Sequence, residues 1–450
     1  MNASLRALAT VVSLLGTVLV GCGPSCPSDG ELQAALARLA PGDRYALDGR
    51  CVVSSGVALS AGTSLEGGTF VLGPGESIRL ATGGTTPTTL AHVQVSSTSA
   101  AAAVIVDGDG TAQISDVAMT LEAGIGIGVR GGTAAITDVT IDGNVDPAHV
   151  LELPVPADPA TLATYGVVVL GGHTTLERVD VRHLASAGVV CESAQLDLRS
   201  TIVVENRGIA IELFDCEADL ASTEVYGTLD APGLPGLGVV AAEGTVLTAS
   251  ALTVRDEPGI GVFVDASTAT LTSPTIARLG QAGAYARTMG TLDVQDGTFT
   301  AVAGAAIATV GAARLSVART TIADTTPAPI LTPGGAGSTT MADGIHVAQD
   351  ATTTTEVRID DTTLRNNERI GAVLDGAARP LDVTLSGVRV EGTGEELGVV
   401  AQNVASLPAG WDASVTRVGS PLTLDATAPL LAVSSGAGAI GILMPPTISF

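Results

Sequence analysis

Residues 166–192 read GVVVLGGHTTLERVDVRHLASAGVVCE and contain one complete unit of a repeat that runs through most of the chain. The unit opens with a glycine and an alternating apolar segment, Gly166-Val-Val-Val, and the same arrangement returns at Gly188-Val-Val-Cys. Two more short alternating segments lie within the unit, at Thr175-Leu-Glu-Arg-Val and Asp180-Val-Arg-His-Leu. Alternation with a period of two residues is typical of β-strands. Each unit is therefore expected to hold three short strands.

Ten such units can be aligned, and consecutive units without an insertion lie 20 to 23 residues apart. The opening glycines are Gly166, Gly188, Gly208, Gly238, Gly261, Gly283, Gly304, Gly344, Gly371 and Gly398. Units of this length are too short for propeller blades, and they lack the leucine-rich and hexapeptide patterns of other solenoids. Stacked units would pair each strand in parallel with its counterpart and bury a continuous apolar interior. This predicts an all-β fold, a single-stranded right-handed parallel β-helix of about 14 coils and roughly 65 Å.

Two corner segments carry a resemblance to a known family. Glu205-Asn206-Arg207-Gly208-Ile209 and Asn366-Asn367-Glu368-Arg369-Ile370-Gly371 resemble the asparagine-then-glycine repeat of the pectin lyase-like superfamily of right-handed β-helices. The beginning of the chain is also similar, from Leu32-Gln33-Ala34-Ala35-Leu36 to Ser64-Leu65-Glu66-Gly67-Gly68. The resemblance covers residues 28–405 and implies the fold. It implies no single reaction, because that superfamily hosts many activities.

The two ends of a solenoid need covers, because an open end is an unpaired sheet edge. Ser28 and Glu31 have the spacing of a capping box, and the leucines that follow lie on one helical face. These leucines are Leu32, Leu36 and Leu39. We therefore expect a short capping helix over residues 29–39, and a C-terminal coil or cap over residues 406–450, which include Trp411.

The N-terminus predicts export and lipidation. Residues 1–21 carry Arg6 and then an uncharged apolar run of 14 residues, which is shorter than a membrane-spanning helix. Leu19-Val20-Gly21-Cys22 follows and resembles a bacterial lipobox, in which the cysteine is acylated. The expected organisation is a signal peptide over 1–21, a lipidated tether over 22–27, and a location in the cell envelope, at the outer membrane or cell surface. The alternative is an ordinary secretory signal with a chance cysteine.

Four cysteines remain when Cys22 is set aside, and they form two local pairs. Cys26 and Cys51 are 25 positions apart, as are Cys191 and Cys216, which is about one coil in each case. An even number of cysteines outside the cytosol favours disulfides. Of the three possible connectivities we expect the local one, Cys26–Cys51 with Cys191–Cys216, and each disulfide should stabilise the fold by about 3 kcal/mol. Buried free thiols are the alternative.

The composition excludes some partners. The net charge is −25, from 21 basic and 46 acidic residues, and there is no lysine in the chain. Such a surface repels phosphate backbones, so nucleic acid is not expected as a partner. Aromatic residues make up 2% of the chain, which is few for the stacking platforms of polysaccharide clefts.

The outward side chains of the glycine-led strands form an unusual column. Counting from the opening glycine, positions +1 and +3 are expected to point inward, as with Ile209 and Ile211, and position +2 outward. The outward column is predicted as Val168, Val190, Ala210, Val240, Phe263, Tyr285, Ala306, His346, Val373 and Val400. It is largely apolar, although a solvated strand face would be polar.

Three proline-rich insertions, 144–164, 229–237 and 326–343, each precede a glycine-led strand and should line one edge of this face. The resemblance implies a ligand groove there, with Val240, Phe263, Tyr285 and His346 as candidate binding residues. The alternative is that the insertions fold over the column as a structural flap. Both alternatives predict that something buries the column.

Charged residues at position +4 are weak candidates for catalysis. Glu192 and Glu212 are expected at equivalent places in adjacent coils, about 5 Å apart, as in a retaining glycosidase. Asp265 and Arg287 form a second neighbouring pair. The alternative is a ladder of solvated charges.

Other motifs carry no complete site. Asp360-Asp361 is similar to the aspartate pair of polygalacturonases, but the partner motifs are missing. Asp107-Gly-Asp109-Gly is interpreted as a turn rather than a calcium loop. No zinc-ligand spacing is present, and neither a metal nor a cofactor is expected.

Two classes of function remain open. The first is a non-enzymatic cell-envelope lipoprotein, a rod that presents a binding or structural surface to a polysaccharide or an envelope protein. The alternative is a carbohydrate-active enzyme of the polysaccharide lyase or glycoside hydrolase type, with its site on the glycine-led sheet face. In both, the lipid on Cys22 would be the contact with the membrane.

Overall fold

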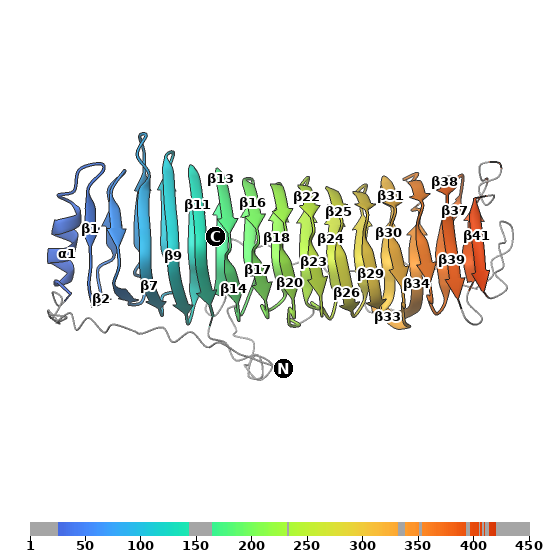
Figure 1. Cartoon of the computed structure of the whole chain (residues 1–450), viewed down its shortest axis with the longest axis horizontal. Coiled ribbons are helices and arrows are strands. Elements are labelled where there is room, and N and C mark those ends of the chain that lie inside the picture. Colours follow the sequence, from blue (N-terminus) through green and yellow to red (C-terminus); the bar gives the residue numbers. More distant parts are fainter. Residues whose placement is uncertain are drawn as a thin grey trace, which may run out of the picture.

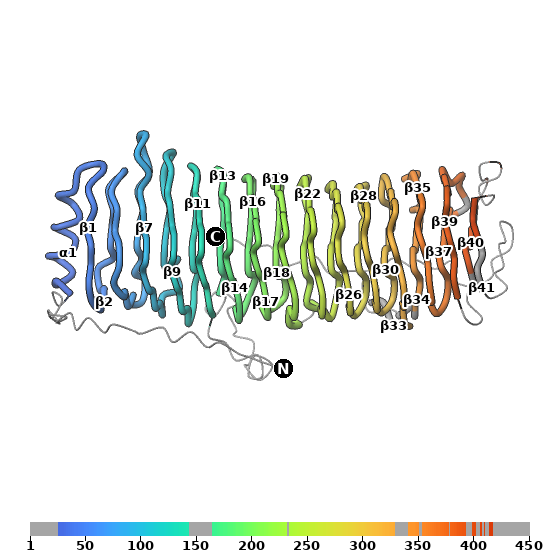
Figure 2. The backbone as a smooth tube through the Cα atoms, in the orientation of Figure 1, coloured from blue at the N-terminus to red at the C-terminus, as the bar shows by residue number. Residues whose placement is uncertain are grey.

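The strands are stacked coil upon coil along one axis, and neighbouring coils follow one another in chain order from α1 to β41 (Figures 1 and 2). The structure is a computed structural model, and it describes residues 26–143, 164–231, 234–331, 338–350, 353–392, 397–404, 406, 409 and 414–419. Each coil contributes to three parallel ladders of strands. The predicted right-handed parallel β-helix, with three short strands per coil, is confirmed.

The glycine-led strands form the first ladder, a continuous parallel path of 14 strands, and so about 14 coils. They are β3 (Val57–Leu59), β6 (Ile78–Thr82), β8 (Ala102–Gly108), β10 (Gly124–Arg130), β12 (Thr164–Leu170), β15 (Val189–Glu192), β18 (Ile209–Phe214), β21 (Leu237–Ala242), β24 (Ile260–Asp265), β27 (Ala282–Arg287), β30 (Gly304–Val310), β34 (Ser338–Ala348), β37 (Ile370–Arg379) and β40 (Leu397–Val404). A short strand, β33 (Ala328–Leu331), pairs in the antiparallel direction with β34.

The second ladder follows the first within each coil. It consists of β1 (Arg44–Ala46), β4 (Ser64–Glu66), β13 (His173–Glu177), β16 (Gln195–Arg199), β19 (Glu217–Ala221), β22 (Val246–Ser250), β25 (Thr268–Thr272), β28 (Thr291–Gln295), β31 (Arg314–Ala318), β35 (Glu356–Asp360) and β38 (Asp382–Ser386). The third ladder consists of β2 (Arg50–Val53), β5 (Thr69–Leu72), β14 (Asp180–Arg182), β17 (Ile202–Val204), β20 (Glu224–Tyr226), β23 (Thr253–Arg255), β26 (Thr275–Leu279), β29 (Thr298–Val302), β32 (Thr321–Ala323), β36 (Thr363–Arg365), β39 (Val388–Gly392) and β41 (Val415–Gly419). Three long strands, β7 (Thr88–Ser97), β9 (Thr111–Leu121) and β11 (Thr133–Asp142), belong to both ladders.

The bend between the second and third ladders is made by one residue per coil with positive φ. These residues stack along the rod as His92, Asp116, Asp138, Arg178, Ser200, Ser222, Ala251, Ser273, Asp296, Arg319 and Asp361, followed by Gly387. A left-handed conformation costs a non-glycine residue roughly 1–2 kcal/mol. The stacked ladders on both sides of the bend compensate for that cost.

Steric crowding explains the glycine that opens each unit. A Cβ atom on Gly238 would lie 2.4 Å from the carbonyl oxygen of Gly261 in the next coil and 2.8 Å from Cγ1 of Val254. Gly261 is equally crowded, because its Cβ would lie 2.6 Å from the carbonyl oxygen of Gly283. The chain enters the first ladder too close to its neighbour for a side chain, and the glycine period follows from this.

Two coils depart from the predicted register. Val189 pairs with Ile211, so Ala210 rather than Gly208 occupies the place of the opening glycine. Ala210 therefore lies in the main core instead of pointing outward, while Ile209 lies on the outer side of the sheet. Ala306 is displaced in the same way, since Tyr285 pairs with Ala308. The alignment on Gly208 was wrong because the corner residues before Ile209 contain an additional glycine.

The N-terminal end is covered as predicted, by a helix shorter than expected. Helix α1 spans Asp29–Leu36, and its Glu31 carboxylate accepts hydrogen bonds from the backbone N–H and the hydroxyl of Ser28. Leu32 and Leu36 are buried in the main core. In the predicted C-terminal cap, β41 continues the third ladder by pairing with β39.

Both predicted disulfides are present, Cys26–Cys51 and Cys191–Cys216, with Cα–Cα distances of 5.1 and 6.3 Å. In the described part of the chain, no helix is both long and apolar enough to cross a membrane. The predicted signal peptide over 1–21, Cys22 and Trp411 lie outside the described residues.

Candidate functional site

The outer face of the first ladder, called the outer face below, carries three rows of side chains along the rod. From β12 to β40 the central row is Val168, Val190, Glu212, Val240, Phe263, Tyr285, Ala308, His346, Val373 and Val400, and it continues toward the N-terminal end as Gly128, Ile105 and Arg79. The row that precedes it in each coil includes Ile209, Leu237, Ile260, Ala282, Ala305, Asp343 and Ile370. The row that follows it includes Leu170, Glu192, Phe214, Ala242, Asp265, Arg287, Val310, Ala348 and Asp375.

The candidate binding residues lie together on the central row, but they are buried. Phe263 and Tyr285 stack with ring centroids 5.6 Å apart, and their exposed fractions are 0% and 1%. Val240 belongs to the same apolar cluster. Leu234 and Met341, which come from two of the insertions, also belong to it. Parts of the insertions thus pack onto the column, as the flap alternative predicts.

Asp265 and Arg287 are neighbours in adjacent coils, as expected. Arg287 Nη2 lies 2.8 Å from Asp265 Oδ2, and the guanidinium carbon is 5.0 Å from the centre of the Phe263 ring. Both side chains are largely buried. The pair therefore neutralises itself at the edge of the apolar cluster.

Glu192 and Glu212 are closely spaced, but not as predicted. Glu212 pairs with Val190, and Glu192 pairs with Phe214, so the two glutamates are not equivalent. They lie one coil and two residues apart on the same face. With strands about 4.8 Å apart and about 3.3 Å per residue, their Cα atoms are about 8 Å apart. The expectation that the two glutamates occupy equivalent places in adjacent coils was wrong, because it rested on the displaced register of Gly208.

The two glutamates have opposite environments. Glu212 is 2% exposed, and its Oε1 atom is buried without a hydrogen-bond partner. Burial raises the pKa of Glu212 to about 8. Burial also raises the pKa of Tyr165, and the nearby charge of Glu212 contributes to that rise. Glu192 is exposed. Glu212 is therefore mainly protonated at neutral pH, close to a solvated carboxylate.

A third polar cluster on the outer face contains two residues that the sequence did not indicate. His346 Nδ1 lies 2.9 Å from Asp343 Oδ2, and Arg369 contacts both oxygens of Asp343, with Nε 2.6 Å from Oδ1. Asp343 is fully buried, and His346 is 3% exposed. Asp343 lies in the row before the central one, which the sequence reading had not recognised as outward. Its position directly before Gly344 was the available signal.

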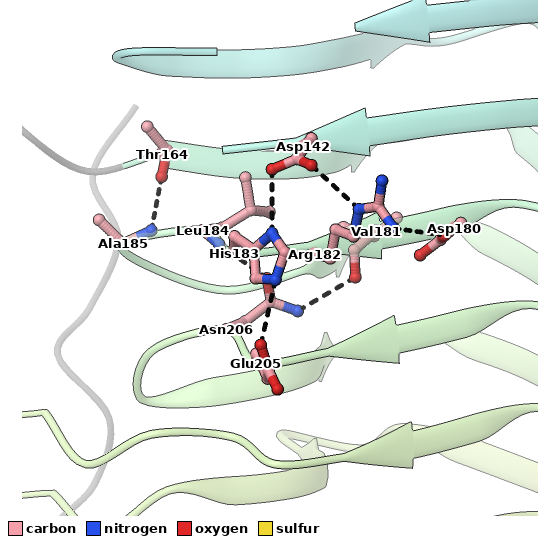
Figure 3. A network of polar contacts seen from close by, with 10 residues as sticks. All are labelled: Asp142, Thr164, Asp180, Val181, Arg182, His183, Leu184, Ala185, Glu205 and Asn206. Carbon is pink, nitrogen blue, oxygen red and sulfur yellow. Dashed lines mark hydrogen bonds and ion pairs between the residues drawn. The ribbon is translucent and has the colours of Figure 1, made fainter. Parts of the chain in front are cut away.

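The corner after the third ladder holds a network that spans three coils (Figure 3). The His183 ring lies between two carboxylates, with Nδ1 3.0 Å from Asp142 Oδ1 and Nε2 3.0 Å from Glu205 Oε2. Arg182 Nε donates to the other oxygen of Asp142 at 3.0 Å. These contacts tie together three neighbouring coils.

A buried side chain completes the same corner in other coils. Asn206 Oδ1 accepts a hydrogen bond from the backbone N–H of Leu184 at 3.1 Å, as Figure 3 also shows. Glu257 Oε2 accepts from the backbone N–H of Thr228 in the same way, at 3.1 Å. The remaining oxygen of Glu257 is buried without a partner, and burial raises the pKa of Glu257 to about 7. Glu257 thus takes the structural place of the corner asparagine.

Among the described residues, no group of three or more His, Cys, Asp and Glu side chains is arranged to hold a metal ion. Three charged groups remain on the outer face as candidates for chemistry, namely the Glu192–Glu212 pair, the Asp265–Arg287 pair and the cluster around His346. Of these, the Glu192–Glu212 pair contains an acid that no cation neutralises in the described part of the chain.

No known family matches the chain, and no curated protein matches it. Solved structures do. The periplasmic alginate epimerase AlgG is 11% identical with a TM-score of 0.45, over 84% of this chain and 82% of that one. Pectate lyase Pel9A is 10% identical with a TM-score of 0.36, over 79% and 72%. The A-module of the Azotobacter vinelandii mannuronan C-5 epimerase AlgE4 is 14% identical with a TM-score of 0.38, over 80% and 91%.

Likenesses of this size concern the path of the chain and say nothing about a reaction. The strand ladders themselves establish the parallel β-helix. The resemblance to right-handed β-helix proteins expected from the sequence is confirmed as a resemblance of fold.

Proposed function

We propose that the protein is a carbohydrate-active enzyme of the glycoside hydrolase type, with Glu212 as general acid and Glu192 as general base. The observation that carries the proposal is a buried carboxyl group, which no described cation neutralises, on the same face as an exposed carboxylate whose Cα atom lies about 8 Å from its own. Inverting glycosidases place their two carboxyl groups roughly 6.5–9.5 Å apart, because a water molecule must fit between one of them and the sugar.

Each glutamate suits its role. With its pKa near 8, Glu212 keeps a proton at neutral pH and can donate it to the glycosidic oxygen. The exposed Glu192 carboxylate can take a proton from a water molecule, which then attacks the anomeric carbon from the opposite side. The leaving sugar departs with the proton of Glu212, and the product has inverted configuration.

Access to Glu212 sets a condition on this function. Glu212 is almost fully buried, whereas Phe214 and Tyr165 on the same face are partly exposed. A glycan reaches the acid only when these side chains part. The same burial favours a second candidate function, a non-enzymatic rod whose apolar column is closed by its own insertions and which serves as a binding or structural protein of the envelope.

Turnover distinguishes the two candidates. Purified full-length protein should be incubated with a panel of polysaccharides and compared with the variants Glu212→Gln and Glu192→Gln. We expect both variants to lose at least about a hundredfold in kcat, the usual contribution of one general acid or base. Fresh product should have inverted anomeric configuration by NMR. Glu243→Gln, on an exposed turn of the described structure, is the matched control. Equal turnover by all variants would contradict the roles given to Glu192 and Glu212, and no turnover by the wild type would favour the rod.

We also propose that the mature protein is anchored in the cell envelope by a lipid on Cys22. The lipobox-like sequence Leu19-Val20-Gly21-Cys22 supports this. Labelled palmitate should enter the wild type and not Cys22→Ser. Equal labelling of both proteins would contradict the anchor and would indicate an ordinary secretory signal.

A further inference from the structure

We propose that the glycan recognised by the outer face carries no acidic groups, which makes it a neutral or amino-bearing polysaccharide rather than a polyuronate or a sulfated polymer. This inference rests on the proposed function, because it names the substrate class of the same site. It is argued from the charges that the outer face presents.

A polyuronate brings one carboxylate with every sugar, and proteins hold such groups with arginine or lysine side chains. The chain has no lysine. At the described outward positions from β15 to β34, Arg287 is the only arginine, and it is bound to Asp265 at 2.8 Å. Two more arginines lie nearer the N-terminal end of the face, Arg130 beside Asp107 and Arg79 on the central row. Arg369 directly precedes β37, and its side chain contacts the outer face. Its Nε and Nη2 atoms both bind the carboxylate of Asp343.

The carboxylates of the same rows outnumber these cations. Asp265 and Asp343 neutralise Arg287 and Arg369, and Glu192 and Asp375 are additional carboxylates, whereas Glu212 is mainly protonated at neutral pH. An anionic sugar next to Glu192 would meet a like charge. At contact distance, two like charges near a protein surface repel each other by a few kcal/mol.

The net charge of the whole molecule also disfavours anionic glycans. Its net charge of −25 produces a negative field around the rod, which slows the approach of polyanions and attracts cations. A neutral glycan is unaffected by that field. A glycan with protonated amines gains affinity from it, and the gain decreases as salt is added.

Binding of three hexasaccharides, of glucose, of glucosamine and of galacturonate, tests the inference. The full-length Glu212→Gln variant should be used in calorimetry at low and high salt, so that no ligand is consumed. We expect the glucose or the glucosamine hexamer to bind at least about tenfold more tightly than the galacturonate hexamer, a difference of about 1.4 kcal/mol. Only glucosamine binding should weaken with salt.

A second variant makes the test specific to the outer face. Asp265→Asn in the same background frees Arg287 from its carboxylate, so affinity for the galacturonate hexamer should increase several-fold. Asp293→Asn, which removes the carboxylate near Arg314 on the second ladder, is the matched control and should cause no gain.

The outcomes separate the two proposals. Preferred binding of the galacturonate hexamer by the Glu212→Gln protein overturns the substrate class, while its turnover by the wild type would leave a carbohydrate-active enzyme in place. Binding of the neutral or amino hexamer without turnover by the wild type supports the substrate class and contradicts the hydrolase. Failure of all three hexamers to bind overturns both.

Discussion

Two regions of the outer face handle a buried charge in different ways. Near β24 and β27, Asp265 is paired with Arg287, and the guanidinium group also lies over the Phe263 ring. Near β15 and β18, Glu212 is at least as well buried, but none of the described cations pairs with it, and its Oε1 atom has no hydrogen-bond partner. The strands are the same kind of strand in the same ladder. An ion pair such as Asp265–Arg287 allows charged side chains to be buried on this face. A buried acid without a partner lowers the stability of the folded protein, and such a cost is characteristic of functional sites.

The largest effect should come from the core beneath both regions. Ile211→Asp places a charge among the inward side chains next to Glu212, and we expect it to lower the free energy of unfolding by at least about 4 kcal/mol. Val246→Asp, at an exposed strand position, is the matched control and should change it by less than about 0.5 kcal/mol. Chemical denaturation measures both. Similar losses at the two positions would contradict the register described for β18.

The next effect tests the compensated pair. Asp265→Ala leaves Arg287 without its carboxylate on a largely buried surface, and should cost about 3 kcal/mol. The double change Asp265→Ala with Arg287→Met should cost less than Asp265→Ala alone, because no uncompensated charge remains. A double-mutant cycle by thermal denaturation gives the coupling. A double variant less stable than the single one would show that the pair does more than neutralise itself.

A smaller effect, of opposite sign, is expected at Glu212. Its folded pKa of about 8 lies above the ordinary value of 4.5, so the folded state keeps a proton that the unfolded state releases. The free energy of unfolding therefore falls as pH rises from about 4.5 to about 8. Glu212→Gln removes this loss and should be more stable than the wild type by about 2 to 4 kcal/mol above pH 8.

Below about pH 4 the Glu212→Gln and wild-type proteins should be equally stable, because Glu212 is protonated in both states. Asp265→Asn is the comparison, since it removes a compensated charge and should destabilise at neutral pH. A Glu212→Gln protein that is less stable at every pH would mean that the carboxylate has a partner and that the contrast between the two regions fails.

The smallest effect on the free energy of unfolding is expected at Glu257, in the corner after the third ladder. Glu257→Asn installs the side chain that Asn206 supplies two corners earlier, and its amide group can both accept and donate a hydrogen bond. Since burial raises the pKa of Glu257 to about 7, the variant should gain about 1 to 3 kcal/mol above pH 7 and nothing below about pH 4. Glu205→Asn, which removes an ion-pair partner of His183, should give no such gain. A pH-independent change at position 257 would contradict the protonated corner.

Much of the fold could be predicted from the sequence. Neighbouring coils are so close where each strand of the first ladder begins that a glycine is required there, and these glycines recur at a regular spacing. Gly238 and Gly261 show why, since a Cβ on either would touch the next coil's backbone. The disulfides were also predictable, because a separation of 25 residues is about one coil. The positive-φ bend was not, because Asp296, Arg319 and Ser273 occupy it with no side chain in common.

The site was less predictable than the fold. The positions of the site residues depend on the register of the strands. The additional glycine, Gly208, led to the prediction that Glu212 lies in the row of Glu192, whereas Glu212 lies in the central row. The pairing of Asp265 with Arg287 was correct because no such irregularity separates those coils. Burial of Glu212 depends on side chains from other coils and insertions, which no local pattern encodes.

The disulfide at the N-terminal end has a mechanical consequence. All ladder hydrogen bonds run along the rod, so each coil is held mainly by its two neighbours and the end coils are the first to fray. Cys26, just before α1, is bonded to Cys51 in β2, which fastens the capping helix to the coil beneath it. That end is therefore held covalently, and α1 should stay on the first coils under an applied pull or a thermal fluctuation until the disulfide is reduced.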